Sequence, residues 1–503
     1  MNPTNPRSVF NYPFSQSFYR LGPQFYSETA ATPLQQTYWI HYNDTLSEWL
    51  GIDNNNETNK MLLDILSGNQ AIEQSSPKGI EKQPSLAMVY AGHQFGGYSP
   101  QLGDGRALLI AQIETPSGTV DLQLKGAGKT PYSRFGDGRA VLRSSIREYI
   151  AGEAMHHLGI PSTRALSLIG SKEPVLREEI ETGAIVARVA RSHIRFGHFE
   201  YFHYTNQHEQ LKQLADYVIQ HFLSEAVHAN DKYEQLLQFT VAQTAKMIAQ
   251  WQSVGFAHGV MNTDNMSIIG ETLDYGPYGF LDDYDPRFIC NHSDHTGRYA
   301  FEEQPSIGLW NLNALAHSLS SLIDTKAIQT ILKNYESILV ETYATLMRKK
   351  LGLTIEKQGD QSLCSSLLGI MAQEKVDYTL LFRGLCDYKV DDDNHHLETL
   401  FSKTPSSSKK WKTWSESYTQ RLVLEESSDE ERHTAMRRVN PKFIARNYLL
   451  QNAINKAQNH QDHSEIETLF TLLQSPFDEH SGYEDYAKAP PTWGKHLSIS
   501  CSS

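Results

Sequence analysis

Cysteine is scarce in this sequence: only four of its 503 residues are cysteines. They are Cys290, Cys364, Cys386 and Cys501. So few thiols at such scattered positions exclude a disulfide framework, and none of their spacings is that of a zinc site. Spacing alone leaves open whether Cys501, close to the end of the sequence, is a stray exposed thiol or a functional one.

Long hydrophobic runs are also missing. No segment approaches the roughly 18 apolar residues that indicate a membrane-spanning helix. The first residues, MNPTNPRSVFNYPFSQSFYR, lack the basic start and the apolar core of a secretory signal peptide. We therefore expect a cytoplasmic protein with no membrane partner.

Positive charge is in deficit. The 45 basic residues are outnumbered by 58 acidic ones, which gives a formal net charge of −13, and there is no long basic run. Nucleic acid and anionic membranes are therefore poor candidates for the main partner. Local basic clusters could still bind a small anion.

The remaining composition is that of a large globular protein. Hydrophobic residues make up 39% of the chain, which is enough for two or three domains or for one elaborated two-lobed enzyme. The polar stretch 75–85 predicts a linker, which follows a short N-terminal region with a helix near 45–50. Short apolar or alternating runs then predict strands over 87–92, 106–113, 119–126, 165–170 and 184–190, with a helix over 139–158 among them.

After about residue 205 the pattern becomes mainly helical. Helices are predicted over 233–257 and near 310–350, whereas the polar segments 402–417 and 425–432 are predicted to be loops. A strand-rich half followed by a helical half predicts an α+β protein with the layout of a protein kinase-like two-lobed fold, in which ATP lies between the lobes. The expected domains are an N-terminal extension (1–84), a kinase-like N-lobe (85–204), a kinase-like C-lobe with the catalytic and metal loop (205–400), and a C-terminal helical extension with a cysteine-containing tail (401–503).

Two motifs in the strand-rich half are suited to phosphate binding. In QLGDGRALLI, Gly103 and Gly105 flank a turn whose backbone amides can approach phosphate oxygens, and Arg106 adds a bidentate donor. Lys125 ends the alternating strand VDLQLK, and Glu148 lies on the following helix; in kinases such a glutamate orients the lysine that grips the nucleotide. Taken separately, each motif is more often structural.

A third motif supplies oxygen ligands. The stretch HGVMNTDNMSIIGETLDYG resembles a kinase catalytic loop followed by the metal-binding Asp-Phe-Gly, but Val260 stands where a kinase has its catalytic aspartate. Asn265 and Asp274 are ligands of the kind that a Mg²⁺–nucleotide complex needs. The residues between them, MSIIGETL, are long enough for a small hairpin that would return Asp274 beside Asn265.

The fourth motif is a set of basic residues that a kinase does not need. Arg188 lies inside the apolar strand AIVARVA, and Arg195 follows in SHIRFGHFEYF. A buried arginine is unfavourable unless an anion or a carboxylate pairs with it. A structural salt bridge explains one such arginine, whereas several of them suggest a deeply held polyphosphate. The loop GKTPYSRFGDGRA adds Lys129, Arg134, Asp137, Gly138 and Arg139.

Taken together, these segments resemble the selenoprotein O family, also called the YdiU family, of protein adenylyltransferases on a pseudokinase fold. The matching strings are YAGHQFGGYSPQLGDGRALLI, LQLKGAGKTPYSRFGDGRAVLRSSIREYIAGEAMHHLGIPSTRAL, RSHIRFGHFEYF, HGVMNTDNMSI, LDYGPYGFLDDYDPRFICNHSDHTGRYAF, QPSIGLWNLNALA, RVNPKFIARNYLLQNAI and PPTWGKHLSISCSS. They run from about residue 85 to the last residue.

The resemblance implies an enzyme that binds ATP in reverse orientation, with the γ-phosphate inward and the α-phosphate facing the acceptor. It implies transfer of AMP to Ser, Thr or Tyr hydroxyls of proteins, release of pyrophosphate, and a Mg²⁺ or Mn²⁺ cofactor. The matching nucleotide-binding positions are Gly103, Gly105, Arg106, Lys125, Asp137, Gly138, Arg188, Arg195 and Asp274. The matching metal ligands are Asn265 and Asp274.

The resemblance also implies roles for Asp264 and Cys501. Asp264 matches the proposed proton acceptor, although it could equally support the metal ligands, because transfer at phosphorus depends mainly on positioning and charge stabilisation. Cys501 occupies the position of a selenocysteine in animal members, which implies redox activity and a reversible disulfide with Cys290. The nearby His292, Asp294 and His295 could bind a metal, but a hydrogen-bonded loop is favoured.

Three other functions stay open at this point. A kinase that transfers the γ-phosphate is disfavoured by Val260, and a non-catalytic pseudokinase scaffold would not need two metal ligands and so many arginines. Transfer of UMP from UTP with Mn²⁺ is a further alternative, because nothing in the sequence reads the base.

Overall fold

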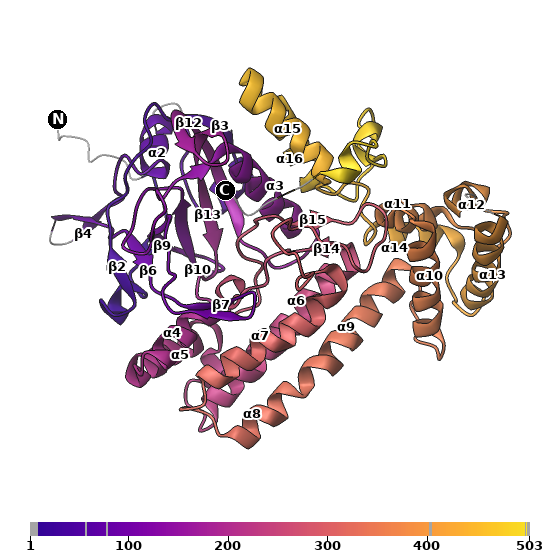
Figure 1. The fold of residues 1–503 in the computed structure, drawn as a ribbon, viewed down its shortest axis with the longest axis horizontal. Helices are drawn as coiled ribbons and strands as arrows, with labels where there is room; N and C mark the ends of the chain where they lie inside the picture. Colours follow the sequence, from indigo (N-terminus) through magenta and orange to yellow (C-terminus); the bar gives the residue numbers. More distant parts are fainter. Residues whose placement is uncertain (1–8, 56–57, 77–78, 402–404, 498, 500–503) are drawn as a thin grey trace.

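The computed structural model describes residues 9–55, 58–76, 79–401, 405–497 and 499 (Figure 1). Cys501 lies outside the described residues.

A nine-stranded sheet dominates the first two hundred residues, in the order β2-β6-β9-β10-β13-β12-β3, with β1 beside β9 and β11 beside β13. Its strands are β1 (Phe14–Ser15), β2 (Tyr26–Glu28), β3 (Tyr38–Tyr42), β6 (Leu86–Met88), β9 (Ala107–Thr115), β10 (Gly118–Lys125), β11 (Ala140–Val141), β12 (Arg164–Leu176) and β13 (Ile180–Ala190). All these pairings are antiparallel. The five predicted strands correspond to β6, β9, β10, β12 and β13, although 87–92 overlaps β6 only at its start and β12 and β13 extend well beyond the predicted ranges. Strands β1, β2, β3 and β11 were not predicted.

The register of β10 and β13 places two charged side chains together. Gln123 is opposite Arg188, and Lys125 is opposite Val186. Because side chains alternate between faces along a strand, Lys125 and Arg188 emerge on the same face of the sheet.

Helix α3 (Leu142–His157) packs across the sheet through a buried face that includes Ile146, Tyr149 and Ile150. Its other side is covered by α15 (Asn447–His460) and α16 (Ser464–Gln474) from the far end of the sequence, as Figure 1 shows. The helix predicted over 139–158 is confirmed, and it begins three residues later because 140–141 pair with β13 instead.

The second half is mainly helical. The predicted helix 233–257 is α6 (Lys232–Val254), which ends at Gly255 in the left-handed conformation, with φ 70°. The region near 310–350 contains α7 (Gln304–Ser318), α8 (Thr325–Leu332) and α9 (Asn334–Lys350). The prediction of one helix there was wrong, because the Asp324 side chain caps the start of α8 after a turn.

The remaining helices complete the two regions. They are α1 (Asp44–Trp49), α2 (Asn59–Leu66), α4 (Phe196–Tyr204), α5 (His208–Phe222), α10 (Asp360–Glu374), α11 (Tyr378–Gly384), α12 (His395–Phe401), α13 (Pro405–Leu422) and α14 (Asp429–Arg437). Short 3-10 helices are η1 (Tyr19–Leu21), η2 (Ser224–Ala226), η3 (Thr263–Asn265), η4 (Phe301–Glu303), η5 (Leu385–Asp387), η6 (Glu484–Ala487) and η7 (Gly494–His496). Small two-stranded sheets pair β4 (Glu73–Ser76) with β5 (Gly79–Lys82), β7 (Gly92–Gln94) with β8 (Gly97–Ser99), and β14 (Phe256–Ala257) with β15 (Gly279–Phe280).

Three predicted loops or linkers were wrong. Segment 402–417 lies largely in α13, whose Trp411, Trp414 and Tyr418 are buried on one face and stack in sequence. Segment 425–432 begins α14, where Ser428 and Glu431 form a capping box. The stretch 75–85 holds most of the β4–β5 hairpin. Polar composition concealed α13 because its buried aromatic residues occupy only one face of the helix.

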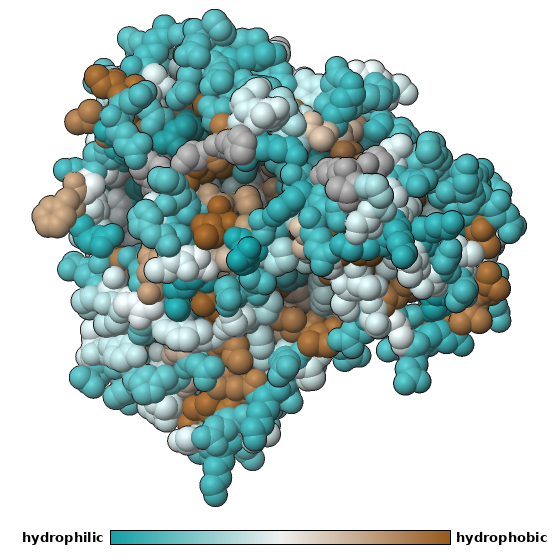
Figure 2. Space-filling model, turned by 45° about the vertical axis from the view of Figure 1, so that its right-hand side comes forward, coloured by the Kyte–Doolittle hydropathy of each residue, from teal (hydrophilic) through white to brown (hydrophobic). Residues whose placement is uncertain are grey.

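The molecule is therefore a mixed α+β protein with one large antiparallel sheet and many helices, as predicted. Figure 2 shows one face, on which hydrophobic residues form small separate patches in a mostly hydrophilic surface. Within the described part of the chain, no helix has the length and apolar character needed to cross a membrane.

Candidate active site

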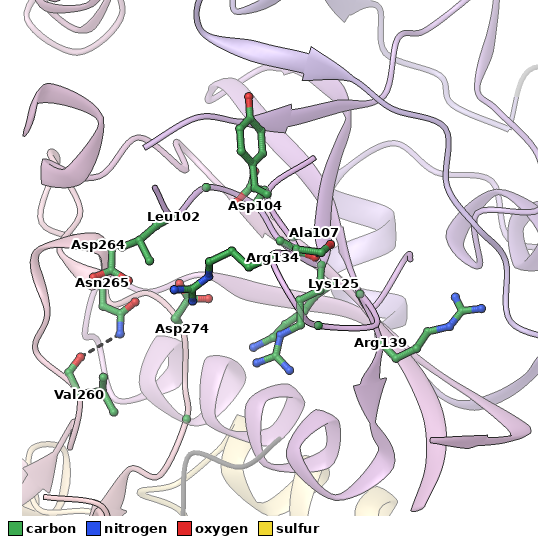
Figure 3. Close-up of a pocket in the computed structure, with 18 of the residues that line it drawn as sticks. Leu102, Asp104, Ala107, Lys125, Arg134, Arg139, Val260, Asp264, Asn265 and Asp274 are labelled. Carbon is green, nitrogen blue, oxygen red and sulfur yellow. Dashed lines mark hydrogen bonds between the residues drawn. The ribbon is translucent and has the colours of Figure 1, made fainter. Parts of the chain in front are cut away.

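A cavity of about 730 Å³ lies where the sheet meets the loops that follow α6. Its lining contains every predicted nucleotide or metal residue except Glu148, namely Gly103, Gly105, Arg106, Lys125, Asp137, Gly138, Arg188, Arg195, Asp264, Asn265 and Asp274. In Figure 3, Asp264, Asn265 and Asp274 lie together on one side of this cavity, and Arg139 lies on the opposite side. Residues that are as much as 171 positions apart in the sequence thus share one pocket, from Gly103 to Asp274.

Lys125 and Arg188 both pair with Glu148 from α3. The Lys125 Nζ atom lies 2.5 Å from Glu148 Oε2, and Arg188 Nε donates to Glu148 Oε1. Burial lowers the pKa of Lys125 to about 8, and the positive charge of Arg188 acts in the same direction. Burial alone would raise the pKa of Glu148, but Arg188 and Lys125 hold it below its ordinary value. The predicted Lys125–Glu148 pair is confirmed, and Arg188 extends it.

Asp274 is held by two arginines. Arg188 Nη2 donates to Asp274 Oδ1 at 2.5 Å, and Arg195 Nη1 donates to Oδ2. Burial alone would raise the pKa of Asp274, but Arg195, Arg188 and Lys125 hold it well below its ordinary value. Its backbone adopts φ 56°, in the left-handed region that is unusual for a residue other than glycine. This carboxylate is therefore fixed in its ionised form at the cavity wall.

The Asp264 carboxylate has fewer positively charged partners than that of Asp274. Gln94 Nε2 donates to Asp264 Oδ2 at 3.1 Å, while Oδ1 is buried and has no hydrogen-bond partner among the described residues. Arg195 Nη1 donates to the backbone carbonyl of Asp264 at 2.7 Å, so the arginine anchors the loop rather than the carboxylate. Burial raises the pKa of Asp264 to about 6. A carboxylate of this kind can accept a proton near neutral pH.

The loop that carries Asp264 is fixed from several elements. In α7, Gln304 Oε1 accepts from His258 N at 2.9 Å, and Asn311 Nδ2 donates to Met261 O at 2.9 Å. His258 Nε2 lies 2.9 Å from Leu273 O, which ties the loop to the segment before Asp274. The loop is consequently rigid before any ligand binds.

Val260 contributes its backbone where a kinase would contribute a carboxylate. Asn265 Nδ2 donates to Val260 O at 2.9 Å, which directs the amide of Asn265 (Figure 3). The bridge between Met266 and Thr272 confirms the small hairpin predicted between Asn265 and Asp274. The amide and the carboxylate therefore reach the same cavity, as the sequence predicted.

The oxygen atoms at this end of the cavity suit a hard divalent cation. Asp274, Asn265 and the unpartnered Oδ1 atom of Asp264 offer carboxylate and amide oxygens. No cluster of three or more His, Cys, Asp or Glu side chains suited to a metal occurs in the described ranges. A cation here would thus take further oxygens from a bound ligand, as Mg²⁺ does when it is bound with nucleotide phosphates.

The loop that carries Gly103 and Gly105, here called the glycine loop, packs against the loop that follows β10. Gly103 has φ 95°, and a Cβ atom on it would lie 2.6 Å from Tyr132 Cγ. Gly138 has φ 73°, and its Cβ would lie 2.2 Å from the backbone of Gly128. Only glycine fits at both positions, and the close packing leaves the backbone at the cavity edge.

Two of the basic residues predicted near the phosphates, Lys129 and Arg139, differ in where their side chains lie. Arg139 donates to Thr32 O, and to Pro33 O at 3.2 Å, and it pairs with Glu173. Lys129 is not among the residues that line the cavity. The expectation was wrong for Lys129, which is exposed. Arg139 does line the cavity, with its guanidinium bound to these partners at the edge.

Asp137 lies at the edge of the cavity with its carboxylate bound to Arg177 Nη1 at 2.8 Å and to Nη2 at 3.0 Å. Arg177 was missed in the sequence, as was Gln94, because neither lies in a recognisable motif.

Asp104 was missed too, although it stands between the two glycines. It is buried and accepts from Met88 N at 3.0 Å and from Tyr90 Oη at 3.2 Å, so it fixes the glycine loop.

Cys290 is buried beside this region, and its Sγ atom lies 3.5 Å from Ala257 O. The next residues form a hydrogen-bonded loop, as favoured: Asp294 accepts from Arg298 N at 3.0 Å and from Tyr299 N at 2.7 Å. His292 N donates to Ile499 O at 2.8 Å, which brings the C-terminal segment to this loop. The Cys290–Cys501 disulfide stays a prediction, to be tested by thiol counts and peptide mapping after oxidation.

Comparison with known proteins decides the family. The family model described as "Protein adenylyltransferase SelO" matches residues 8–474. The chain belongs to the SelO family. A relative from Vibrio atlanticus (strain LGP32), named protein nucleotidyltransferase YdiU, is 50% identical over 491 residues, covering 97% of this chain and 98% of its own.

Further relatives with the same printed name support this membership. The protein from Aliivibrio fischeri (strain ATCC 700601 / ES114) is 51% identical, covering 96% of this chain and 97% of its own. That from Vibrio cholerae serotype O1 is 49% identical, with 97% and 98% covered. The SelO family is one of protein nucleotidyltransferases, so this chain is an enzyme of that class.

Proposed function

We propose that this SelO-family protein transfers AMP from ATP to Ser, Thr or Tyr hydroxyls of proteins and releases pyrophosphate. The observation that carries the proposal is the clamp of Arg188 and Arg195 on Asp274, in one cavity with Arg106 and Lys125. Lys125, Arg188 and Arg195 bring positive charge to one wall of this cavity, and the phosphates of a nucleotide triphosphate would complement it.

The fold proposed for this activity is kinase-like and two-lobed, with the division at 1–84, 85–204, 205–400 and 401–503. The sheet and α3 would form one wall of the cleft, with Lys125, Glu148 and Arg188. The loops after α6, anchored by α7, would form the other wall, with Asp264, Asn265 and Asp274. ATP would lie in reverse orientation, because the cations deepest in the cavity favour the β- and γ-phosphates over the base.

The reaction joins the acceptor oxygen to the α-phosphorus and breaks the bond to the oxygen that bridges to the β-phosphate. Lys125, Arg188 and Arg106 would hold the departing pyrophosphate and stabilise its charge. A divalent cation, Mg²⁺ or Mn²⁺, held by Asn265 and Asp274, would neutralise phosphate charge when bound. The hydroxyl proton would pass to Asp264 Oδ1, the oxygen that lacks a partner. Asp137 and Gly138 would contact the nucleotide from the cavity edge.

Incubation with ATP labelled on the α- or the γ-phosphate tests the proposal. We expect label on protein from α-labelled ATP and none from γ-labelled ATP. Label from the γ position alone would identify a kinase, and no label from either would identify a non-catalytic scaffold. UTP labelled on the α-phosphate, with Mn²⁺, tests the alternative of UMP transfer.

A matched pair of variants tests the metal role. Asp274→Ala should abolish transfer, whereas Asp285→Ala should not, because the Asp285 carboxylate contacts Lys375 and the Arg287 backbone N–H and does not line the cavity. Transfer by the Asp274→Ala variant would contradict the metal assignment.

A further inference from the structure

The β7–β8 hairpin lies over the loop that carries Asp264. Gln94 Nε2 donates to Asp264 Oδ2, and Phe95 N donates to Asn262 Oδ1 at 3.2 Å and to Tyr299 Oη at 3.0 Å. Tyr299 Oη in turn donates to Asn262 Oδ1 at 2.6 Å. The hairpin, the catalytic loop and the segment around Tyr299 therefore meet at the Asp264 end of the cavity.

Arg298 lies at this junction. Its guanidinium carbon is 4.8 Å from the centre of the Trp310 ring and 5.8 Å from that of Tyr299. The turn of the hairpin lies on the same group, since a Cβ on Gly96 would be 3.4 Å from Arg298 Cζ. Arginine is favoured for such stacking because its planar cation can lie on an aromatic face while its edge stays available for hydrogen bonds. The guanidinium is therefore held in place before any partner arrives.

The positive charge of Arg298 is not neutralised by a neighbour. Within the described part of the chain, no carboxylate lies within the 4.0 Å that defines an ion pair with it. Its Nε atom is buried and has no hydrogen-bond partner there. A hydrogen bond from Arg298 opposes the rise in the pKa of Tyr299 that burial causes, so a neutral hydroxyl is its polar neighbour. The chain carries a net charge of −13, so acidic residues are plentiful. An immobilised arginine with no carboxylate beside it is therefore unexpected.

Arg298 does not belong to the nucleotide cavity, because it is absent from its lining. Exposed aromatic groups lie on and beside the hairpin that covers it: Phe95 is 45% exposed, and Tyr204 is 40% exposed. Tyr204 packs on Tyr98 of the hairpin, with ring centres 4.4 Å apart. A rigid cation beside exposed aromatic rings suits a polypeptide that carries an acidic side chain.

We propose that Arg298, Trp310 and Phe95 form an acceptor subsite that binds an Asp or Glu side chain close to the modified hydroxyl. This inference rests on the proposed function, because the subsite selects the polypeptide that function modifies. Gln94, which contacts Asp264, and Gly96, which contacts Arg298, are two residues apart in a tight turn, so their Cα atoms are at most about 7 Å apart. With the Gln94 side chain and its hydrogen bond at one end and the gap to Arg298 at the other, Asp264 and Arg298 are at most about 20 Å apart, which about six residues of extended acceptor would span. The acid therefore lies within about six residues of the hydroxyl.

Fluorescein-labelled peptides test the subsite. Each peptide carries one Tyr, and Glu is placed in turn at each of the six positions on either side, with Gln at the same position in the matched peptide. Binding is measured by fluorescence anisotropy without nucleotide, and transfer is measured with α-labelled ATP. We expect one Glu peptide to exceed its Gln partner about tenfold in affinity and in kcat/KM, and the difference to shrink at high salt.

Variants of Arg298 test whether this residue causes the preference for Glu peptides over Gln peptides. Arg298→Gln should reduce the Glu-to-Gln ratio to below about twofold, while pyrophosphate release without peptide stays at the wild-type rate. Arg298→Glu should reverse the preference toward a Lys peptide. Arg287→Gln should keep the full ratio, because Arg287 is exposed on the same segment and away from the hairpin.

The outcomes separate this inference from the proposed function. Equal binding of Glu and Gln peptides at every position would overturn the subsite, and label transfer would still support the proposed function. A Glu preference that survives Arg298→Gln would also overturn it. Selective binding that depends on Arg298, with no label transferred from ATP, would support the surface and overturn adenylyl transfer.

Discussion

At the scale of single residues, the loop that carries Val260 in place of the kinase aspartate contains another carboxylate, Asp264. Val260 keeps only a backbone role, since its carbonyl directs Asn265. Asp264 carries the one carboxylate oxygen at the cavity that is buried and lacks a partner among the described residues. The acid that could take a proton is thus displaced along the loop, while the metal-binding half of the kinase pattern remains.

The Asp264→Asn variant separates the two roles open to this side chain. The amide keeps the size of the carboxylate but takes up no proton, so as a proton acceptor its replacement should lower kcat about 10²–10⁴-fold. The metal dependence and the KM for ATP should change less than about threefold. Single-turnover transfer with metal titration measures both. A large rise in the metal requirement with little loss of kcat at saturating metal would assign Asp264 to metal support.

Lys350 is a second residue that leads to a prediction, in this case for the free energy of unfolding. It is buried and has no ion-pair partner among the described residues, with its Nζ atom 4.4 Å from the centre of the Phe382 ring. Burial lowers its pKa to about 7. Because the unfolded chain keeps the ordinary, higher pKa, it binds more protons than the folded chain between about pH 7 and 10, so this residue makes stability rise with pH in that range.

The Lys350→Met variant tests this dependence. Methionine fills similar space without charge, so it should raise the free energy of unfolding by roughly 1–3 kcal/mol at pH 6–7. The gain should fall as pH rises above 7 and vanish above about pH 10, where the lysine of the unfolded chain is also neutral. Urea unfolding at several pH values measures it. A gain that is constant with pH would contradict the assignment.

At the scale of elements, α3 is the part that connects the C-terminal helices to the cavity. Arg147 precedes Glu148 on α3, and it donates to Asn447 Oδ1 in α15 at 3.2 Å and to Tyr278 O at 2.6 Å. On another face of α3, Tyr149 Oη lies 2.8 Å from His41 Nδ1, and His41 Nε2 lies 2.7 Å from Glu467 in α16. The residues on both sides of Glu148 are thus fixed by the C-terminal helices.

The Asn447→Ala variant should loosen this connection. It removes an acceptor from a buried guanidinium, which we expect to lower the free energy of unfolding by about 1–3 kcal/mol. It should also raise the KM for ATP several-fold, because Glu148 and its Lys125 partner gain freedom. Thermal unfolding and ATP titration measure the two effects. Gln451→Ala is the control, since its exposed side chain bonds only Asn455; an unchanged KM in Asn447→Ala would contradict the coupling.

At the scale of the whole molecule, the sequence predicted local chemistry better than long-range packing. Five strands, α3 and the hairpin before Asp274 follow from periodicity and glycine placement. The Lys125–Glu148 pair follows from the kinase-like motif, whereas the contact of Arg188 with Glu148 was not predicted. The roles of Gln94, Arg177 and Arg298 could not be predicted, because each depends on contacts between segments far apart in the chain. Helix α13 was missed because its buried tryptophans and tyrosine lie in a polar segment whose partners are α10 and α12.

The contact between α3 and α15 also has a consequence for protein synthesis. Arg147 and Asn447 are 300 residues apart, and a ribosome adding roughly 5–20 residues per second needs about 15–60 s to make the stretch between them. During that time the nascent chain already contains Lys125 and Glu148 but lacks the helix that steadies α3. Until α15 has emerged, Arg147 in the growing polypeptide lacks its Asn447 acceptor, so we expect α3 to be held less firmly in the nascent chain than in the finished one.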